Sequence, residues 1–247
     1  MTYRTVAEGV HLLEHAAVNL YLIEDEDGLT LVDTGLPATF GRIAAAVRAV
    51  GRNPGELRAV VLTHAHFDHV GSARRIQQRW GTPIYVHSAE RYLTAHPYRY
   101  RHERARLWYP LRYPRAVPVL ARMAAAGALA VRGVRAVRTF EPGAELPVPG
   151  RPRVIATPGH TSGHCALHLP GRDAVLAGDA LVTLDPYTGR TGPQIVSGAA
   201  TADSEVALRS LTALAETGAS TVLPGHGEPW TGGVTAAVEA ALRAGPS

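Results

Sequence analysis

The chain has 247 residues, of which 46% are apolar, and this length and composition are typical of one globular domain with its own core. Its single cysteine, Cys165, excludes an internal disulfide framework and fits a reducing compartment. The sequence has no lysine, so all 25 basic residues are arginine and Schiff-base catalysis is excluded. No apolar run reaches the roughly 20 residues that span a bilayer and no signal-peptide pattern opens the chain, so we expect a cytoplasmic protein without a transmembrane segment.

The first part of the chain predicts strands that alternate with helices. Stretches rich in β-branched and other apolar residues, separated by turn signals, predict strands over residues 5–15, 18–24, 29–33, 57–62 and 83–87. Apolar residues at helical spacing predict one helix over residues 37–50, which Gly51 ends, and another over residues 70–80.

Residues 88–134 interrupt this alternation with an insertion rich in arginine and tyrosine. An apolar, Ala-rich run predicts one helix over residues 117–131, and four prolines divide the rest. Residues 91–138 hold eleven arginines and one acidic residue, Glu103, which is a net charge of +10. We expect a helical insertion that lies over the edge of a sheet, within a single domain formed by residues 1–247.

The second half of the chain returns to strands and helices. Strands are expected over residues 135–140, 153–156, 165–169, 174–176 and 221–223. Helices are expected over residues 204–216, with Ser204 as the N-cap, and over residues 234–243.

The clearest chemical signal is the sequence Thr-His-Ala-His-Phe-Asp-His at residues 63–69. It places four side chains that can bind a metal ion within six residues: His64, His66, Asp68 and His69. The motif lies between a predicted strand and a predicted helix, where open α/β sheets usually bind ligands. Imidazole and carboxylate ligands suit zinc, and also iron or manganese.

Three further candidate ligands, His160, Asp179 and His226, follow predicted strands or lie in loops rich in Gly and Pro. Five histidines and two aspartates exceed what one tetrahedral ion needs, and this favours two metal ions. Both halves of the chain share the same order of elements: two strands, an aspartate, a helix, a strand and a histidine. Two such β-rich halves with helices outside predict an α+β fold, an αββα sandwich whose ligand-bearing ends meet in one cleft.

These elements resemble the metallo-β-lactamase-fold hydrolase superfamily. The resemblance covers nearly the whole chain and rests on the Asp-Thr-Gly sequence at residues 33–35, on the His-x-His-x-Asp-His motif, and on the order of the three later ligands. It implies two metal ions, with the ligands His64, His66 and His160 for one, Asp68, His69 and His226 for the other, and Asp179 as the bridge.

The resemblance also implies a mechanism. Two metal ions about 3.5–4 Å apart can share a hydroxide, lower its pKa, and stabilise the oxyanion that forms when it attacks a carbonyl or phosphorus. Asp68 and Asp179 are the predicted catalytic residues, Asp68 as a proton shuttle to the leaving group and Asp179 as the bridging ligand. Asp33 is expected to orient the motif loop by hydrogen bonds. We expect two divalent ions, first of all zinc, with iron or manganese as the alternatives.

The predicted function is hydrolysis of an ester, thioester or lactone bond in a small molecule, in a branch similar to glyoxalase II or to the lactonases. Lactonases of this superfamily usually carry a tyrosine three residues after the bridging aspartate, where this chain has Val182, and the nearest tyrosine is Tyr187. A single-iron persulfide dioxygenase and a metal-dependent phosphodiesterase or nuclease are the alternatives.

The insertion at residues 88–134 leaves three interpretations open, because fold alone does not name a substrate. It could form a pocket for an anionic or aromatic substrate, or it could be a solvated helical face that is partly used in a homodimer. Contact with nucleic acid or acidic lipid is the third interpretation, and nucleic acid is the less favoured partner.

Overall fold

The structure is a computed structural model that describes residues 3–247, and its larger sheet contains seven strands in the order β1 to β7. Neighbouring strands are antiparallel from β1 to β4 and parallel from β4 to β7. Tight turns join the antiparallel neighbours, whereas the parallel ones need longer crossovers. The strands are β1 (Arg4–Ala7), β2 (Val10–His15), β3 (Val18–Asp25), β4 (Gly28–Val32), β5 (Leu57–Val61), β6 (Ile84–His87) and β7 (Arg138–Phe140).

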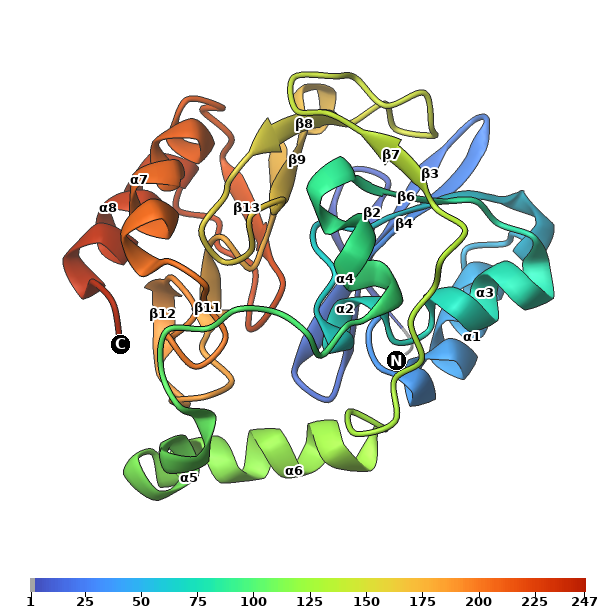
Figure 1. Ribbon diagram of the computed structural model, residues 1–247. Coiled ribbons are helices and arrows are strands. Elements are labelled where there is room, and N and C mark those ends of the chain that lie inside the picture. The colour runs from blue at the N-terminus through green and yellow to red at the C-terminus, as the bar shows by residue number, and fades with distance from the viewer. Residues whose placement is uncertain (1–2) are drawn as a thin grey trace.

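The second sheet has four strands in the order β13-β10-β9-β8. They are β8 (Arg153–Ala156), β9 (Cys165–Leu169), β10 (Ala174–Gly178) and β13 (Thr221–Pro224). A separate antiparallel hairpin consists of β11 (Val182–Leu184) and β12 (Thr191–Gln194). The two larger sheets face each other, and the chain between their strand ends forms the loops that carry the predicted ligands (Figure 1).

Helices cover the outer face of each sheet, so the predicted αββα sandwich is confirmed (Figure 1). The first sheet packs against α1 (Phe40–Ala49) and α3 (Ala73–Trp80), and the second against α7 (Ser204–Ala215) and α8 (Val234–Ala244). Successive strand residues point to opposite faces. Val60 therefore joins the cluster under α1 and α3, while Val61 joins the cluster between the two sheets.

The repeat that the sequence predicts is present as a repeat of strand pairing. In the first sheet β3 is antiparallel to β4 and β4 is parallel to β5. In the second sheet β9 is antiparallel to β10 and β10 is parallel to β13. The two units end in the same way, because β5 and β13 lead to His64 and His226, and β4 and β10 lead directly to Asp33 and Asp179.

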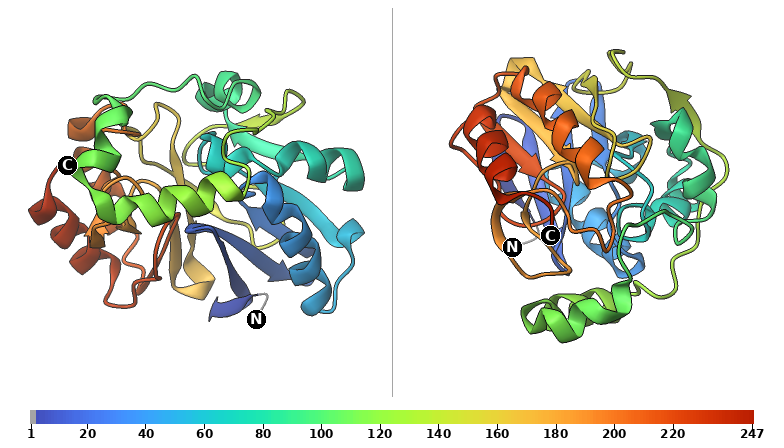
Figure 2. Two further views of the ribbon diagram at one scale, coloured as in Figure 1. Left: turned by 90° about the horizontal axis from the view of Figure 1, so that it is seen from below. Right: turned by 60° about the vertical axis from the view of Figure 1, so that its left-hand side comes forward.

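The insertion at residues 88–134 forms short helices, the last two of which lie along the bottom of Figure 1 and at the edge of the molecule in Figure 2. They include α4 (Arg91–Ala95), α5 (Tyr109–Arg112) and α6 (Val117–Ala125). Val119 and Met123 of α6 pack into the same cluster as the first sheet. Among residues 3–247, no helix combines the length and apolar character that crossing a membrane requires.

Several elements differ from the predictions. The strand predicted over residues 5–15 is two strands, because Gly9 has φ +57° and the chain turns there. The helix predicted over residues 117–131 ends at Ala125, since Gly127 has φ +95°, which terminates a helix. The helix predicted over residues 70–80 is α2 (Phe67–Val70) followed by α3. The β11–β12 hairpin was not predicted, because neither strand has the apolar alternation of a core strand.

Candidate metal centre

The structure brings all seven predicted ligands into one buried cluster at the ends of four strands. The motif at residues 63–69 follows β5, and His226 follows β13. His160 lies between β8 and β9, and Asp179 follows β10 directly. None of the seven residues is more than 6% exposed. The parallel pairs β4–β5 and β10–β13 explain the convergence, because the carboxyl ends of parallel strands lie at the same edge of a sheet.

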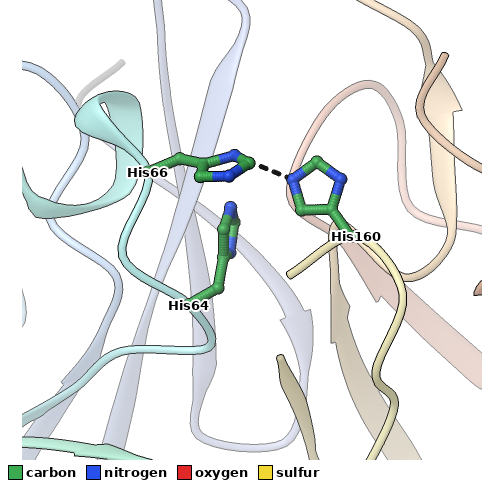
Figure 3. A group of neighbouring side chains, drawn as sticks. All are labelled: His64, His66 and His160. Carbon is green, nitrogen blue, oxygen red and sulfur yellow. Dashed lines mark hydrogen bonds between the residues drawn. The ribbon is translucent and has the colours of Figure 1, made fainter. Parts of the chain in front are cut away.

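The first group contains His64, His66 and His160, whose rings point toward one another (Figure 3). One ring nitrogen from each lies within 4.8 Å of the other two. His66 Nδ1 and His160 Nε2 are 2.9 Å apart. Nitrogens that share a tetrahedral zinc ion at its usual bond length are about 3.3 Å apart, so this trio can close around one ion with small adjustments.

The second group contains Asp68, His69 and His226, with one ligand atom from each within 4.8 Å of the others. His226 Nε2 is 3.5 Å from Asp68 Oδ2. This group combines two imidazoles with a carboxylate, whereas the first group has imidazoles alone. In the absence of a metal ion, the negative carboxylate makes the imidazoles of the second group bind protons more tightly than those of the first group.

Asp179 lies between the two groups. Its Oδ2 is 3.5 Å from His160 Nε2 and 3.2 Å from His226 Nε2, while its Oδ1 is 3.4 Å from His69 Nε2. A Cβ atom at Gly225 would lie 2.0 Å from Asp179 Oδ1, so only glycine lets the His226 loop pass this close. Asp179 is therefore placed to contact ions in both groups.

Buried polar atoms in the cluster lack hydrogen-bond partners within the described residues. These atoms are the Nε2 atoms of His64, His66 and His69, together with Asp179 Oδ1. Buried polar groups without partners are rare and costly, so each requires an explanation. Divalent cations would satisfy all four atoms, and the donor set of nitrogen and carboxylate oxygen suits zinc, iron or manganese. The residues therefore fit a two-ion centre.

The ring nitrogens that face away from the cluster are held by hydrogen bonds. His226 Nδ1 donates to the backbone oxygen of Ala17, with a separation of 2.6 Å. His160 Nδ1 is 3.2 Å from Thr201 Oγ1. Such bonds fix the orientation and tautomer of a metal-binding imidazole and leave its other nitrogen free to bind.

Asp33 makes the hydrogen bonds expected of a residue that orients the motif loop. Its Oδ1 accepts from the Thr63 amide at 2.9 Å, and its Oδ2 accepts from Thr63 Oγ1 at 2.8 Å and from His69 Nδ1 at 2.9 Å. Thr63 Oγ1 lies in turn 3.0 Å from His64 Nδ1. Asp33 adopts φ +60°, a conformation rare outside glycine, asparagine and aspartate. One carboxylate thus positions ligands of both groups.

The imidazoles of the first group are neutral. Burial, reinforced by repulsion from neighbouring histidines, lowers the pKa of His64 and His66 well below the usual value. Burial lowers the pKa of His160 to about 4. Metal ions bind the neutral form of imidazole, so this group needs to lose no proton on binding at neutral pH.

The second group behaves differently because its imidazoles face carboxylates. Burial disfavours the charged form of His69, but Asp179 and Asp33 outweigh burial and raise its pKa well above the usual value. The pKa of His226 is raised in the same way, by Asp179 and Asp68 against the effect of burial. Burial would raise the pKa of Asp179, but His226 and His69 hold it well below the usual value.

The other histidines and the cysteine lie outside the two groups. His164 has both ring nitrogens in hydrogen bonds, at 2.8 Å from Thr157 Oγ1 and accepting from the Asp179 amide at 3.0 Å. It therefore positions Asp179. Burial lowers the pKa of His164 to about 3 and raises the pKa of Cys165 to about 12, which keeps both groups uncharged.

The sequence did not single out Tyr100 or Glu90, although both touch the centre. The Tyr100 ring lies 3.7 Å from the His66 ring, centroid to centroid, and its hydroxyl is 3.5 Å from that of Tyr187. Tyr187 is the tyrosine nearest to Asp179 in sequence, so it lies close to the centre despite its different spacing. Glu90 is fully buried beside the ligand loops. Neither residue belongs to a motif, and only the folded chain brings them to the site.

A pocket of about 450 Å³ lies behind the His160 loop, with Tyr100 forming part of its wall. Arg99 and Arg101 line this pocket, together with Tyr92 and Ser162. The arginine-rich insertion therefore supplies two cations to a cavity whose wall contacts His66.

Comparison with known proteins agrees with this geometry. The family model of the metallo-beta-lactamase superfamily matches residues 14–226. The chain is 30% identical to the "Probable metallo-hydrolase YflN" of Bacillus subtilis, over 92% of this chain and 86% of that protein. It is 28% identical to an N-acyl homoserine lactonase of a Bacillus species, over 85% of this chain and 86% of that protein.

A solved structure gives the same result. The protein TTHA1623, in a di-iron-bound form, superposes with a TM-score of 0.64 at 27% identity, over 93% of this chain and 96% of that one. The family model matches most of the chain, the chain is similar to YflN, and it contains a buried histidine–aspartate cluster. The chain therefore belongs to the metallo-beta-lactamase superfamily and is a metallohydrolase of that family.

Proposed function

We propose that the protein is a dinuclear metal-dependent hydrolase that cleaves an ester, thioester or lactone bond in a small molecule. The observation that carries the proposal is the pair of ligand groups with Asp179 between them, in which four buried ligand atoms have no hydrogen-bond partner among the described residues. A single ion would leave one of the two groups uncompensated. We therefore propose His64, His66 and His160 as ligands of one ion, Asp68, His69 and His226 as ligands of the other, and Asp179 as the bridge.

The bound ions would lower the pKa of a water molecule and stabilise negative charge on the reacting carbonyl oxygen. Asp68 is the most exposed of the seven residues, at 6%. We assign it the transfer of a proton, through a carboxylate oxygen, to the leaving group. Asp179 holds the two groups together through both of its oxygens. Tyr100 covers one face of His66 and keeps water from that side.

The relatives support this class of substrate and leave the substrate itself open. One relative is named as an N-acyl homoserine lactonase and another as a metallo-hydrolase. Zinc is the first candidate for the ion because the first group has imidazole ligands only. Iron is the alternative, since TTHA1623 is described in a di-iron-bound form.

An activity panel with parallel metal analysis tests the proposal. Metal-free protein is loaded with zinc, iron or manganese, the ions per chain are counted by mass spectrometry, and each form is assayed with esters, thioesters, lactones and phosphodiesters. We expect two ions per chain and turnover of carboxylic ester, thioester or lactone substrates. Full activity with one ion would contradict the two-metal proposal.

The same panel separates the alternatives. Iron-dependent oxygen uptake with glutathione persulfide would assign the protein to the dioxygenases instead. Turnover confined to phosphodiesters, with steep salt dependence of binding, would assign it to the nucleases.

A further inference from the structure

Glu90 is a fully buried carboxylate that the proposed mechanism does not use. It ends the turn Ser88–Glu90, which follows β6 directly. Strand β6 pairs in parallel with β5, so the residues after β6 lie beside the motif loop that follows β5. The backbone thus places an acidic side chain next to His64 and His66, although Glu90 lies more than twenty residues later in the sequence.

The two oxygens of Glu90 accept hydrogen bonds from two different loops. Oε2 accepts from the amide of Ala65, the residue between His64 and His66, at 2.9 Å. Oε1 accepts from the amide of Gly163, three residues after His160, at 3.0 Å. The motif loop belongs to the first sheet and the His160 loop to the second, so one side chain bridges the two sheets at the ligands.

Glycine at position 163 makes this bridge possible. A Cβ atom there would lie 2.9 Å from both Cγ and Oε1 of Glu90 and 2.7 Å from His87 Nδ1. Such distances are too short for real contacts, so only glycine lets the His160 loop approach the carboxylate this closely. The fit between Glu90 and Gly163 is therefore specific to both residues.

Within residues 3–247, no ion pair compensates the burial of the Glu90 carboxylate, and the nearby His87 pairs with Glu141 instead. A buried carboxylate without an ion pair is costly, and a smaller polar or apolar residue would avoid that cost. Its compensation comes from backbone amides, and both amides belong to loops that carry ligands of the first group.

We infer that Glu90 is a positioning residue for the first metal group, which holds His64 and His66 at the right separation from His160. The inference rests on the proposed two-metal function. Glu90 contacts the backbone on both sides of the first group and contacts no ligand of the second group. Its loss therefore weakens binding of the first group's ion more than binding of the second group's ion. Partners of this kind around a metal site typically change metal affinity by about 10- to 100-fold when removed.

The test replaces Glu90 with glutamine, which has the same shape but turns one acceptor oxygen into an amide donor that faces a backbone N–H. Zinc affinities of the metal-free full-length protein are measured by competition with a chromophoric chelator, and cadmium-113 NMR resolves the two sites by their ligands. We expect Glu90→Gln to weaken binding of one ion by about 10- to 100-fold and to leave the other within about threefold. In the NMR spectrum the resonance of the all-imidazole site shifts or disappears.

Glu141→Gln is the matched control. Glu141 lies next to β7, its side chain is 68% exposed, and it contacts His87, not the ligand loops. We expect it to bind both ions as the wild type does. Should Glu90→Gln fail to fold, Gly163→Ala serves as the second variant, because it crowds the same carboxylate from the other side and is expected to weaken the same ion.

The outcomes separate this inference from the proposed function. Equal weakening of both ions, together with a lower unfolding temperature of the metal-free protein, would assign Glu90 a general structural role and overturn the inference. Unchanged affinities in Glu90→Gln would also overturn it, while wild-type protein that binds two ions would leave the proposed function intact. Wild-type protein that binds fewer than two ions would contradict the proposed function itself.

Discussion

At the scale of single residues, the centre divides its imidazoles into two protonation classes. Those of the first group are neutral because burial disfavours their charged form. His69 and His226 carry raised pKa values because Asp179 is close to both. In the metal-free protein these two protons therefore offset the buried carboxylates, and a metal ion in the second group has to displace them.

The first prediction concerns the pH dependence of metal binding. Since the pKa of His69 is raised, its proton stabilises the metal-free fold at low and neutral pH, and this stabilisation is lost as the pH rises through the raised pKa. The affinity of the second group should therefore increase with pH over the neutral range, while that of the first group stays nearly constant. Calorimetry in buffers of different ionisation enthalpy would measure more proton release when the ion of the second group binds than when the ion of the first group binds. Equal release by both ions would contradict the prediction.

The second prediction concerns His66. Replacing it with alanine removes one of three imidazoles from the first group while its neighbours stay fixed by Asp33 and Thr63. We expect turnover to fall by about 10³-fold or more and one ion to be lost, with the circular dichroism spectrum unchanged. His102→Ala, at an exposed position of the insertion, is the control and should keep full activity. A His66 variant that retains activity would refute its place in the centre.

At the scale of elements, the segment 98–106 of the insertion is held by contacts with the first residue of α7 and the loop before it. Glu103 accepts from the Ser204 amide at 2.7 Å and from Ser204 Oγ at 2.6 Å. Arg106 donates to the backbone oxygen of Ala199, and its guanidinium lies 4.2 Å from the centre of the Tyr100 ring. These contacts hold Tyr100 against His66.

The third prediction follows from this anchoring. Glu103→Ala removes two hydrogen bonds to a carboxylate, each worth about 1 kcal/mol in a partly exposed setting. We expect hydrogen exchange in segment 98–106 to become about tenfold faster and KM to rise, with little effect on metal content. The control is Glu205→Ala, in which the lost carboxylate is exposed and pairs with Arg209 on the helix surface. Unchanged exchange in Glu103→Ala would show that other contacts hold the segment.

The elements that the sequence predicted well are those that bury an apolar face. Strands β8 and β9 occupy the predicted residues, because their apolar residues pack in the core. The sequence did not predict the β11–β12 hairpin because its strands do not bury a regular apolar stripe. The hairpin instead supports the His226 loop through hydrogen bonds of Thr183. The early end of α6 was missed because the Ala-rich run continues past the glycine that stops the helix.

At the scale of the whole molecule, the positive charge is concentrated in one segment of the chain. Residues 91–138 carry eleven arginines and one acidic residue. Two of these arginines, Arg99 and Arg101, line the pocket behind Tyr100. We propose that this pocket receives an anionic part of the substrate. A homodimer contact and a cytoplasmic location stay predictions from the sequence.

The fourth prediction tests this proposal. The double substitution Arg99→Gln and Arg101→Gln should raise KM about tenfold for substrates with a carboxylate or phosphate group and leave KM for neutral substrates of the same class unchanged. Arg132→Gln, an exposed arginine of the same insertion outside the pocket, is the control. If both substrate classes change equally, the arginines act on structure and not on substrate charge.

The sequence by itself determined the sandwich, the family resemblance and the candidate ligands, because the relevant signals are local. Strand periodicity, the spacing within residues 63–69, and a histidine or aspartate at a strand end can all be read from neighbouring residues. The tertiary structure decided which other residues support the centre. Glu90, Tyr100 and Thr201 carry no motif, and each reaches a ligand or a ligand-bearing loop only because parallel strand ends and the insertion bring distant segments together. The protonation of His69 likewise depends on Asp179, which lies more than a hundred residues away in the sequence.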